Sequence, residues 1–288
     1  MRLKLHSLYN HFPKHNPVDG EPFIHCYNDK FVINKKPERN SIALLIEPRS
    51  LLPEPYRFIE EHPDKYQLIF THDSILLSTL PNARHILYGG VWGESGTQAS
   101  LWGENKFTVP QFHDVPKTKG ISFCSSNKEY CYLHRQRKEW AYKLEKDIDC
   151  MGTYNGGKRV STFDIYGEYK FSVVIENYID DFWFTEKVCN AFANKCVPIY
   201  YGARKINYFF DVGGMVIVHN LYDLPRIIRS IKYDMDWEYG KRNKEIQINF
   251  EKVKQYAVFE DWFFDRWGKE LDEFYENTIN NNHPLLQH

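Results

Sequence analysis

The chain has 288 residues, and its 37 Lys and Arg residues nearly balance its 38 Asp and Glu residues, giving a formal net charge of −1. This balance predicts no general attraction to nucleic acid or to an anionic membrane. No apolar run approaches the ~18 residues of a membrane-spanning helix, and residues 1–17 lack the apolar core of a signal peptide. Six cysteines are scattered without a CxxC pair, which is typical of free thiols in a reducing compartment. We therefore expect a cytoplasmic protein with no transmembrane segment and no nucleic-acid partner.

The first part of the chain alternates strand-like and helix-like patterns. Strands are predicted at 41–46, 66–71 and 83–88, with helices at 55–61 and 72–77. Such repeated β-α units predict a parallel sheet with right-handed crossovers. Residues 1–40 are polar and rich in Pro, Asn and Lys, and only 31–33 resemble a short strand.

A stretch rich in Gly, Thr and Pro, residues 89–118, follows, and we interpret it as a long loop and an interdomain linker. The predicted domains are therefore 1–118 and 119–288. In the second domain the patterns predict strands at 120–125, 171–175, 197–201 and 215–218, and helices at 131–147, 185–194, 221–233 and 239–277. Residues 148–168 contain four glycines and are predicted to be a loop.

Polar residues gather in one βαβ unit of the second domain. They lie at the carboxyl end of its first strand and at the start of its helix: Glu176, Asn177, Thr185, Glu186 and Lys187. Parallel sheets bind ligands at this edge, where helix N-termini favour anions. The pattern alone equally describes any α/β crossover with a polar rim.

The literal order of these residues, E-N followed by T-E-K and then V-P-I-Y-x-G, closely resembles the donor-binding motif of the α1,3-fucosyltransferases, glycosyltransferase family 10. The resemblance is strong over residues 169–202. It implies an α/β, GT-B-like fold of two Rossmann-like domains with parallel sheets and a cleft between them. The known Golgi members carry a membrane anchor that this chain does not show, which suggests a bacterial or viral type of enzyme.

The resemblance also implies roles for the residues of the motif. Lys187 matches the family's lysine that contacts the diphosphate, and Glu186 matches the glutamate that hydrogen-bonds the ribose hydroxyls. Asn177 is expected to bridge the donor sugar and a phosphate. Glu176 is expected to pair with a neighbouring cation and shape the loop, and Thr185 suits the N-cap of the helix.

Two further donor-site positions depart from the family pattern. Arg137, in R-K-E-W, resembles the family's R-x-x-F and is preferred over Arg135 as a second phosphate clamp, since a guanidinium binds phosphate bidentately. Trp183 stands where many family members have a tyrosine near the donor. An indole keeps the capacity to stack but removes a phenolic hydroxyl, so the role of Trp183 is left open.

The base that deprotonates the acceptor is expected in the first domain. Glu47 follows the strand at 41–46 as a glutamate of the family follows a buried strand, although here the turn reads I-E-P instead of G-E-N. Glu94 is the rival, and His72 and His113 are weaker candidates.

The metal prediction depends on one short string. Asp234 and Asp236 form a D-x-D sequence, the metal signature of GT-A transferases, but here it lies between two predicted helices and not after a strand. We therefore expect no obligatory metal, with a divalent ion at most assisting through the diphosphate.

The resemblance predicts an inverting glycosyltransferase that moves a sugar from a nucleotide diphosphate donor, first GDP-fucose, to a hydroxyl of an acceptor glycan. One alternative keeps this GT-B mechanism but uses a UDP-sugar such as UDP-xylose. An alternative from another class is a non-catalytic carbohydrate-binding protein with a decayed transferase fold, which the 16% aromatic content also fits.

Overall fold

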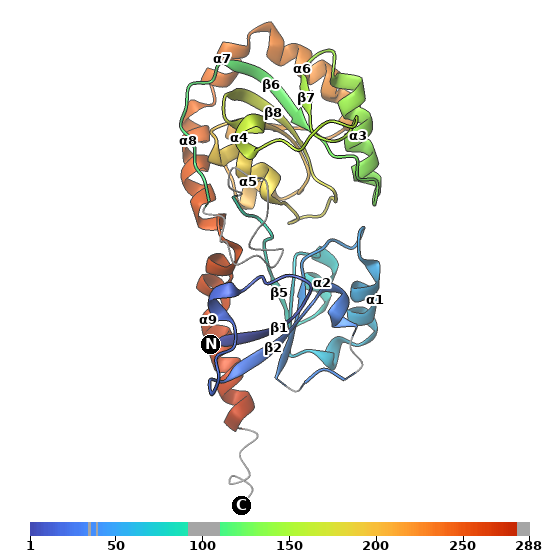
Figure 1. Cartoon of the computed structure of the whole chain (residues 1–288), viewed down its shortest axis with the longest axis vertical. Helices are drawn as coiled ribbons and strands as arrows, with labels where there is room; N and C mark the ends of the chain where they lie inside the picture. The colour runs from blue at the N-terminus through green and yellow to red at the C-terminus, as the bar shows by residue number, and fades with distance from the viewer. Residues whose placement is uncertain (34–35, 39, 92–109, 281–288) are drawn as a thin grey trace, which may run out of the picture. The chain divides into compact units, whose positions relative to one another are not determined.

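The computed structural model describes residues 1–33, 36–38, 40–91 and 110–280 (Figure 1). These residues form two compact units. The first combines Met1–Ile86 with the C-terminal segment that begins at Phe259, and the second contains the described residues from Leu87 to Val258. Each unit is built on its own parallel five-stranded sheet, so the predicted α/β class is confirmed.

The strands of the first sheet follow one another in chain order: β1 (Arg2–His6), β2 (Phe23–Asn28), β3 (Ser41–Leu45), β4 (Leu68–Thr71) and β5 (Ala83–His85). The connections contain α1 (Pro53–Glu61), α2 (Ser74–Thr79) and the 3₁₀ helices η1 (Pro13–His15), η2 (Asp29–Val32) and η3 (Pro63–Lys65). All five residues of the central strand β3 are buried, which explains its uninterrupted apolar sequence. Glu47 follows this strand by two residues.

Residues 31–33 do not form the predicted strand. Asp29 has a positive φ of 47°, and the chain turns there into η2. Conversely, β1 and β2 lie within residues 1–40, which were predicted to be largely irregular. β1 is an edge strand with a single buried residue, so its sequence carries little of the apolar pattern that marks a central strand.

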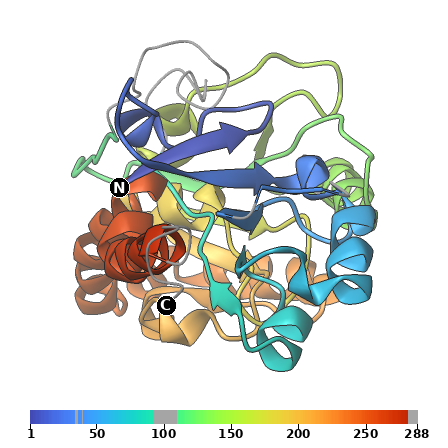
Figure 2. The ribbon, with the colours of Figure 1, turned by 90° about the horizontal axis from the view of Figure 1, so that it is seen from below.

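The C-terminal helix α9 (Phe259–Asn280) packs in the first unit. In Figures 1 and 2 it is the red helix beside the strands of that unit. Phe263 is fully buried, with its ring centroid 4.9 Å from that of Phe12 and 4.9 Å from that of Phe70. Arg84 forms an ion pair with Glu270 at 2.7 Å.

The second sheet has the strand order β10-β9-β8-β6-β7. Its strands are β6 (Lys119–Cys124), β7 (Asp149–Met151), β8 (Tyr169–Ile175), β9 (Val197–Tyr201) and β10 (Val216–Ile217). Its helices are α3 (Tyr132–Leu144), α4 (Thr162–Tyr166), α5 (Glu186–Ala193), α6 (Leu224–Tyr233), α7 (Met235–Gly240) and α8 (Asn243–Lys252), with 3₁₀ helices η4 (Ile206–Tyr208), η5 (Val212–Gly214), η6 (Leu221–Asp223) and η7 (Val253–Tyr256).

The strand order of this sheet reverses at β6, which pairs with β7 on one side and with β8 on the other. Parallel sheets bind ligands beside such a point, at the carboxyl ends of the strands.

Alternate residues of β8 hold two helices against the second sheet. Phe171, Val173 and Ile175 belong to one buried apolar cluster with Trp140 of α3 and Ile228 of α6. The Cys131 thiol, at the N-cap of α3, donates to the Asn177 carbonyl just after β8 at 3.2 Å, so the start of α3 and the end of β8 lie at the same edge.

Residues 148–168 are not only loop, because they contain β7 and α4. Helix α4 begins with a capping box, in which the Ser161 hydroxyl accepts from the Asp164 N–H at 3.0 Å and the Asp164 carboxylate accepts from the Ser161 N–H at 3.3 Å. Both elements are short and the segment contains four glycines, so its sequence shows no clear strand or helix pattern.

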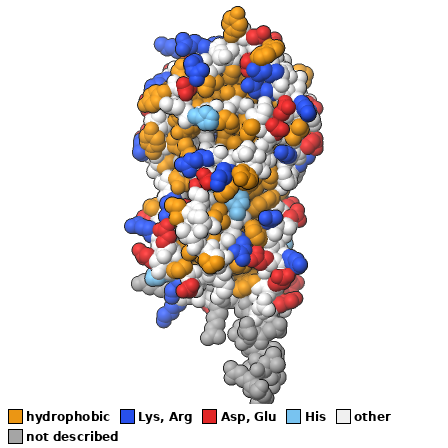
Figure 3. Space-filling view, turned by 180° about the vertical axis from the view of Figure 1, so that it is seen from behind, with side chains coloured by type: hydrophobic (Ala, Val, Ile, Leu, Met, Phe, Trp, Pro, Cys, Tyr) orange, Lys and Arg blue, Asp and Glu red, His pale blue; other side chains and the backbone are white. Residues whose placement is uncertain are grey.

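The surface carries both charges. On the face shown in Figure 3, Lys and Arg side chains lie interspersed with Asp and Glu side chains. Among the described residues, no helix combines the length and the apolar character that crossing a membrane requires.

We predict that Phe263→Ala destabilises the protein by about 3–5 kcal/mol, because it leaves a cavity between α9 and the sheet of the first unit. Denaturant unfolding followed by tryptophan fluorescence measures the change. Tyr233→Ala is the matched control, since that ring is 94% exposed and its loss should change little. Equal stability of the two variants would contradict the assigned packing of α9.

Candidate functional site

The loop from β8 to α5 is fixed at its two ends by one carboxylate. Glu176, the residue after β8, is fully buried. Its Oε1 accepts from the Thr185 N–H at 3.0 Å and its Oε2 accepts from the Thr185 hydroxyl at 2.7 Å. Burial raises the pKa of Glu176, while the nearby Lys187 ammonium opposes that rise. Glu176 thus joins the two ends of the loop through Thr185.

Thr185 caps α5 and also orients Lys187. The Thr185 hydroxyl accepts from the Lys187 backbone N–H at 3.4 Å and from the Lys187 ammonium at 2.9 Å. The same ammonium lies 3.1 Å from Glu186 and 3.5 Å from Glu176. Its side chain is 23% exposed, so Lys187 is held by two carboxylates but still reaches solvent at the edge of the sheet.

Asn177 and Trp183 contact each other across the same loop. The indole N–H of Trp183 donates to the side-chain oxygen of Asn177 at 3.1 Å, and the Asn177 carbonyl accepts from the Cys131 thiol at 3.2 Å. Trp183 is 2% exposed. In this arrangement the indole braces the loop and offers little surface on which a ligand could stack.

Arg137 is the least satisfied charged residue of this site. It lies on α3 and is only 7% exposed, yet its Nε has no hydrogen-bond partner, and the guanidinium makes no ion pair with any described residue. A buried cation without a partner is expensive. The positive charges of Arg137 and Lys187 both act on Cys124 at the end of β6, although burial dominates and raises the pKa of that thiol to about 11. The two cations therefore belong to one cluster.

His134 belongs to the same cluster and is absent from the sequence-predicted site. It lies three residues before Arg137 on α3, is 5% exposed, and its Nδ1 is buried without a partner. Burial, followed by the charges of Arg137, Lys187 and Lys128, lowers the pKa of His134 to about 4. The only sequence signal for it was the i, i+3 spacing, which places both side chains on one face of the helix.

Glu47 belongs to the first unit. Asp29 Oδ1 accepts from the backbone N–H groups of Ile46 at 2.8 Å and Glu47 at 3.0 Å, and the Tyr56 hydroxyl donates to the Glu47 carbonyl at 2.7 Å. Desolvation raises the pKa of Asp29 to about 7. The backbone at Glu47 is thus held from two elements.

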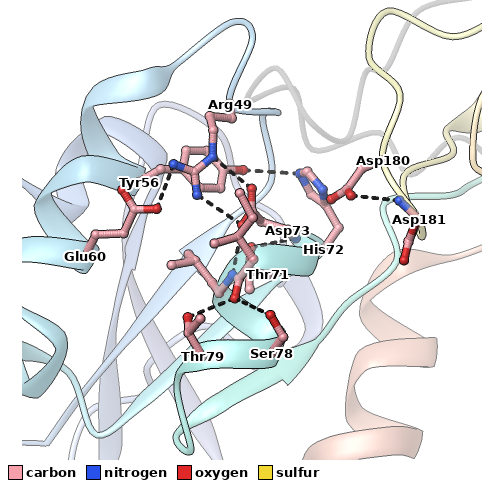
Figure 4. Close-up of polar contacts among 12 residues, drawn as sticks. Arg49, Tyr56, Glu60, Thr71, His72, Asp73, Ser78, Thr79, Asp180 and Asp181 are labelled. Carbon is pink, nitrogen blue, oxygen red and sulfur yellow. Dashed lines mark hydrogen bonds and ion pairs between the residues drawn. The ribbon is translucent and has the colours of Figure 1, made fainter.

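Next to Glu47, Arg49 connects several elements of the first unit (Figure 4). Its guanidinium binds both carboxylate oxygens of Asp73, at 3.0 and 3.1 Å, and pairs with Glu60 at 2.9 Å. The Tyr56 hydroxyl lies 3.2 Å from Nε2 of His72, a residue that is 1% exposed. Burial lowers the pKa of His72 to about 3. The rival base Glu94 lies outside the described residues.

The D-x-D string has structural roles. Asp234 accepts from the Trp237 N–H at 3.2 Å and caps α7, and Asp236 pairs with Lys170 at 2.6 Å. In the described part of the chain, no group of three or more His, Cys, Asp or Glu residues is arranged to hold a metal ion.

The second sheet and its edge match a known family. Residues 115–220 match the model described as the C-terminal part of glycosyltransferase family 10 (fucosyltransferase). A curated relative, GDP-fucose protein O-fucosyltransferase 3 of Danio rerio, is 32% identical over 82 residues, which cover 27% of this chain and 18% of the relative. The chain thus spans less than a fifth of that relative's length. These matches confirm the resemblance to family 10 that the motif indicates, and they support the predicted class of enzyme, a glycosyltransferase.

Solved structures support the fold. TarM matches with a TM-score of 0.53 at 11% identity, over 87% of this chain and 55% of that one. The GtfA/B complex matches with a TM-score of 0.51 at 10% identity, over 88% and 57%. An α1,3-fucosyltransferase solved with GDP has a TM-score of 0.49 at 17% identity, over 83% of both chains. The first two matches support the assignment of the α/β fold to that of the GT-B glycosyltransferases.

We predict a specific pH dependence of stability from Glu176. Because its pKa is raised in the folded protein, the folded state retains a proton that the unfolded state loses, so stability falls as the pH rises from the ordinary range of a glutamate to the raised pKa. Glu176→Gln removes this contribution. Between pH 4 and 8, the melting temperature of the wild type should fall relative to that of Glu176→Gln as the pH rises through that window. A difference that stays constant over this range would refute the assignment.

Proposed function

We propose that the chain is an inverting glycosyltransferase that transfers a sugar from a nucleoside diphosphate donor to a hydroxyl of an acceptor glycan. The observation that carries this proposal is the 7% exposed Arg137, whose Nε is buried without a partner and whose guanidinium makes no ion pair with a described residue, in a cluster with Lys187. A diphosphate would supply the anion that this cluster lacks. The edge of a parallel sheet beside its change of strand direction is a favourable place for such a ligand.

The roles of the site residues follow from their contacts. Arg137 and Lys187 stabilise the negative charge that develops on the leaving nucleotide. Glu186, beside Lys187, accepts from the ribose hydroxyls, since one carboxylate can accept from both hydroxyls of a cis-diol. Asn177 positions the donor sugar. Glu176, Thr185 and Trp183 hold the loop that carries these groups.

In the transfer step, the acceptor oxygen attacks the anomeric carbon and forms the new glycosidic bond. The bond between that carbon and the β-phosphate oxygen breaks, and the nucleoside diphosphate leaves with the electron pair. Glu47 takes the proton of the acceptor hydroxyl. A single displacement of this kind inverts the anomeric centre. No step requires a metal, because two protein cations offset the charge of the diphosphate.

GDP-fucose is the proposed donor. The support is the family-10 match over residues 115–220 and the similarity to a relative whose name includes GDP-fucose. A UDP-sugar such as UDP-xylose would be held by the same cationic cluster, and the nucleobase decides between the two donors. A carbohydrate-binding protein with a decayed fold is the alternative from another class. A protein of that class would not explain why Nε of Arg137 is buried without a partner.

Arg137→Met tests the carrying observation. We expect it to weaken binding of the cognate nucleotide by roughly 30-fold to 1,000-fold, as expected when a buried charge loses its partner. The same change should raise the melting temperature of the ligand-free protein, because it removes an uncompensated buried charge. Thermal-shift titrations with GDP and with UDP measure both effects and identify the base.

Arg135→Met is the matched control, since Arg135 lies on the same helix but is exposed. It should leave nucleotide binding unchanged. A wild-type protein that binds neither nucleotide would overturn the proposed function. Loss of stability in Arg137→Met with unchanged binding would assign Arg137 a structural role.

Glu47→Gln tests the base. We expect transfer from GDP-fucose to fall by about 10²–10⁴-fold while nucleotide affinity stays unchanged, because general base catalysis contributes that much and Glu47 is not part of the donor site. Product formation from labelled donor measures the rate. Glu61→Gln, at an exposed position of α1, is the control. A transfer rate in Glu47→Gln equal to that of the control would assign the base elsewhere.

A further inference from the structure

His134 is a buried polar group that neither the fold nor the proposed transfer step explains. Its side chain is 5% exposed and its Nδ1 is enclosed without a hydrogen-bond partner. Buried polar atoms in proteins are nearly always satisfied, so an orphan of this kind calls for a reason. The same helix carries two more atoms of this kind, Nε of Arg137 and Nε1 of Trp140, and Arg137 shares the cationic cluster with Lys187.

The groups around His134 are cationic or neutral. Arg137 lies on its own helix, Lys187 on α5, and Lys128 in the loop between β6 and α3, and all three disfavour the charged imidazole. The ring of Tyr130 packs edge to face against the imidazole, with centroids 6.0 Å apart. No carboxylate among the described residues is close enough to offset these charges at His134. The free protein therefore keeps His134 neutral, with a pKa of about 4.

An anionic ligand reverses this balance. A diphosphate placed against Arg137 and Lys187 adds negative charge next to the imidazole. This charge favours the imidazolium. We propose that His134 is a third group of the anion site and takes up a proton when a nucleoside diphosphate binds. This proposal rests on the proposed function, because it assumes that the anion is a diphosphate.

The proton uptake makes donor and product affinity depend on pH. The bound form has the higher pKa, so affinity rises as the pH falls from the pKa of the complex towards the pKa of the free protein, and becomes constant below the latter. A nucleoside diphosphate is also released more readily at the upper end of this range. His134 thus acts as a positioning and charge-matching residue, and the acceptor proton still goes to Glu47.

Calorimetry measures the uptake directly. GDP-fucose, titrated without acceptor at pH 6, is a suitable probe because its diphosphate has no proton to exchange near neutral pH. Binding heats in two buffers of different ionisation enthalpy give the number of protons taken up. We expect about half a proton or more for the wild type and almost none for His134→Gln. His219→Gln, at an exposed histidine of the same unit, should behave as the wild type.

Equal uptake in the wild type and in His134→Gln, or binding of GDP-fucose without uptake, would overturn the proposal and leave the proposed function intact. Pyrophosphate separates the remaining outcomes. If the wild type binds pyrophosphate but not GDP-fucose or UDP, and takes up a proton that His134→Gln does not, the proton-linked anion site stands while the proposed function fails. If nothing binds, both fail.

A second measurement covers the case in which His134→Gln does not fold. Histidine ring signals of the wild type, followed by NMR from pH 4 to 8, give the pKa of His134 with and without GDP-fucose. We expect the pKa to rise from about 4 to the ordinary range of a histidine or above it when the ligand is present. An unchanged pKa in the complex would refute the proposal.

Discussion

The candidate site depends on one interaction, the two hydrogen bonds by which the buried Glu176 carboxylate joins the end of β8 to Thr185, the N-cap of α5. The buried Glu176 needs hydrogen-bond donors for both of its side-chain oxygens. Thr185, at the other end of the loop, supplies a backbone N–H and a hydroxyl. The same hydroxyl then accepts from Lys187. The carboxylate therefore determines where the lysine stands, although Glu176 itself has no access to solvent.

Much of this arrangement could be predicted from the sequence, for physical reasons. Central strands such as β3 and β8 are buried on both faces, so their apolar sequences identify them. Contacts within the T-E-K motif are local in sequence, and so their spacing predicts their geometry. β1 was missed because an edge strand with one buried residue carries a weak pattern. His134 was missed because its significance depends on what surrounds it after folding.

Burial without a partner separates Arg137 and His134 from the polar residues of the loop between β8 and α5. Glu176 accepts from Thr185, and Asn177 accepts from Trp183, so these contacts stabilise the loop in the absence of any ligand. Arg137 and His134 instead retain unmet hydrogen-bonding capacity and positive potential. Proteins tolerate such groups mainly where a ligand completes them, because the free state then bears a cost that binding recovers.

The packing of α9 in the first unit has a consequence for the order of folding. The described residues of the second unit lie between Leu87 and Val258, whereas the first unit needs Met1–Ile86 and the helix that begins at Phe259. During synthesis the second unit can close while the first still exposes the face that Phe12 and Phe70 present to Phe263. This face stays uncovered until the last helix emerges, so the early strands are the part of the nascent chain most exposed to aggregation or to chaperone binding.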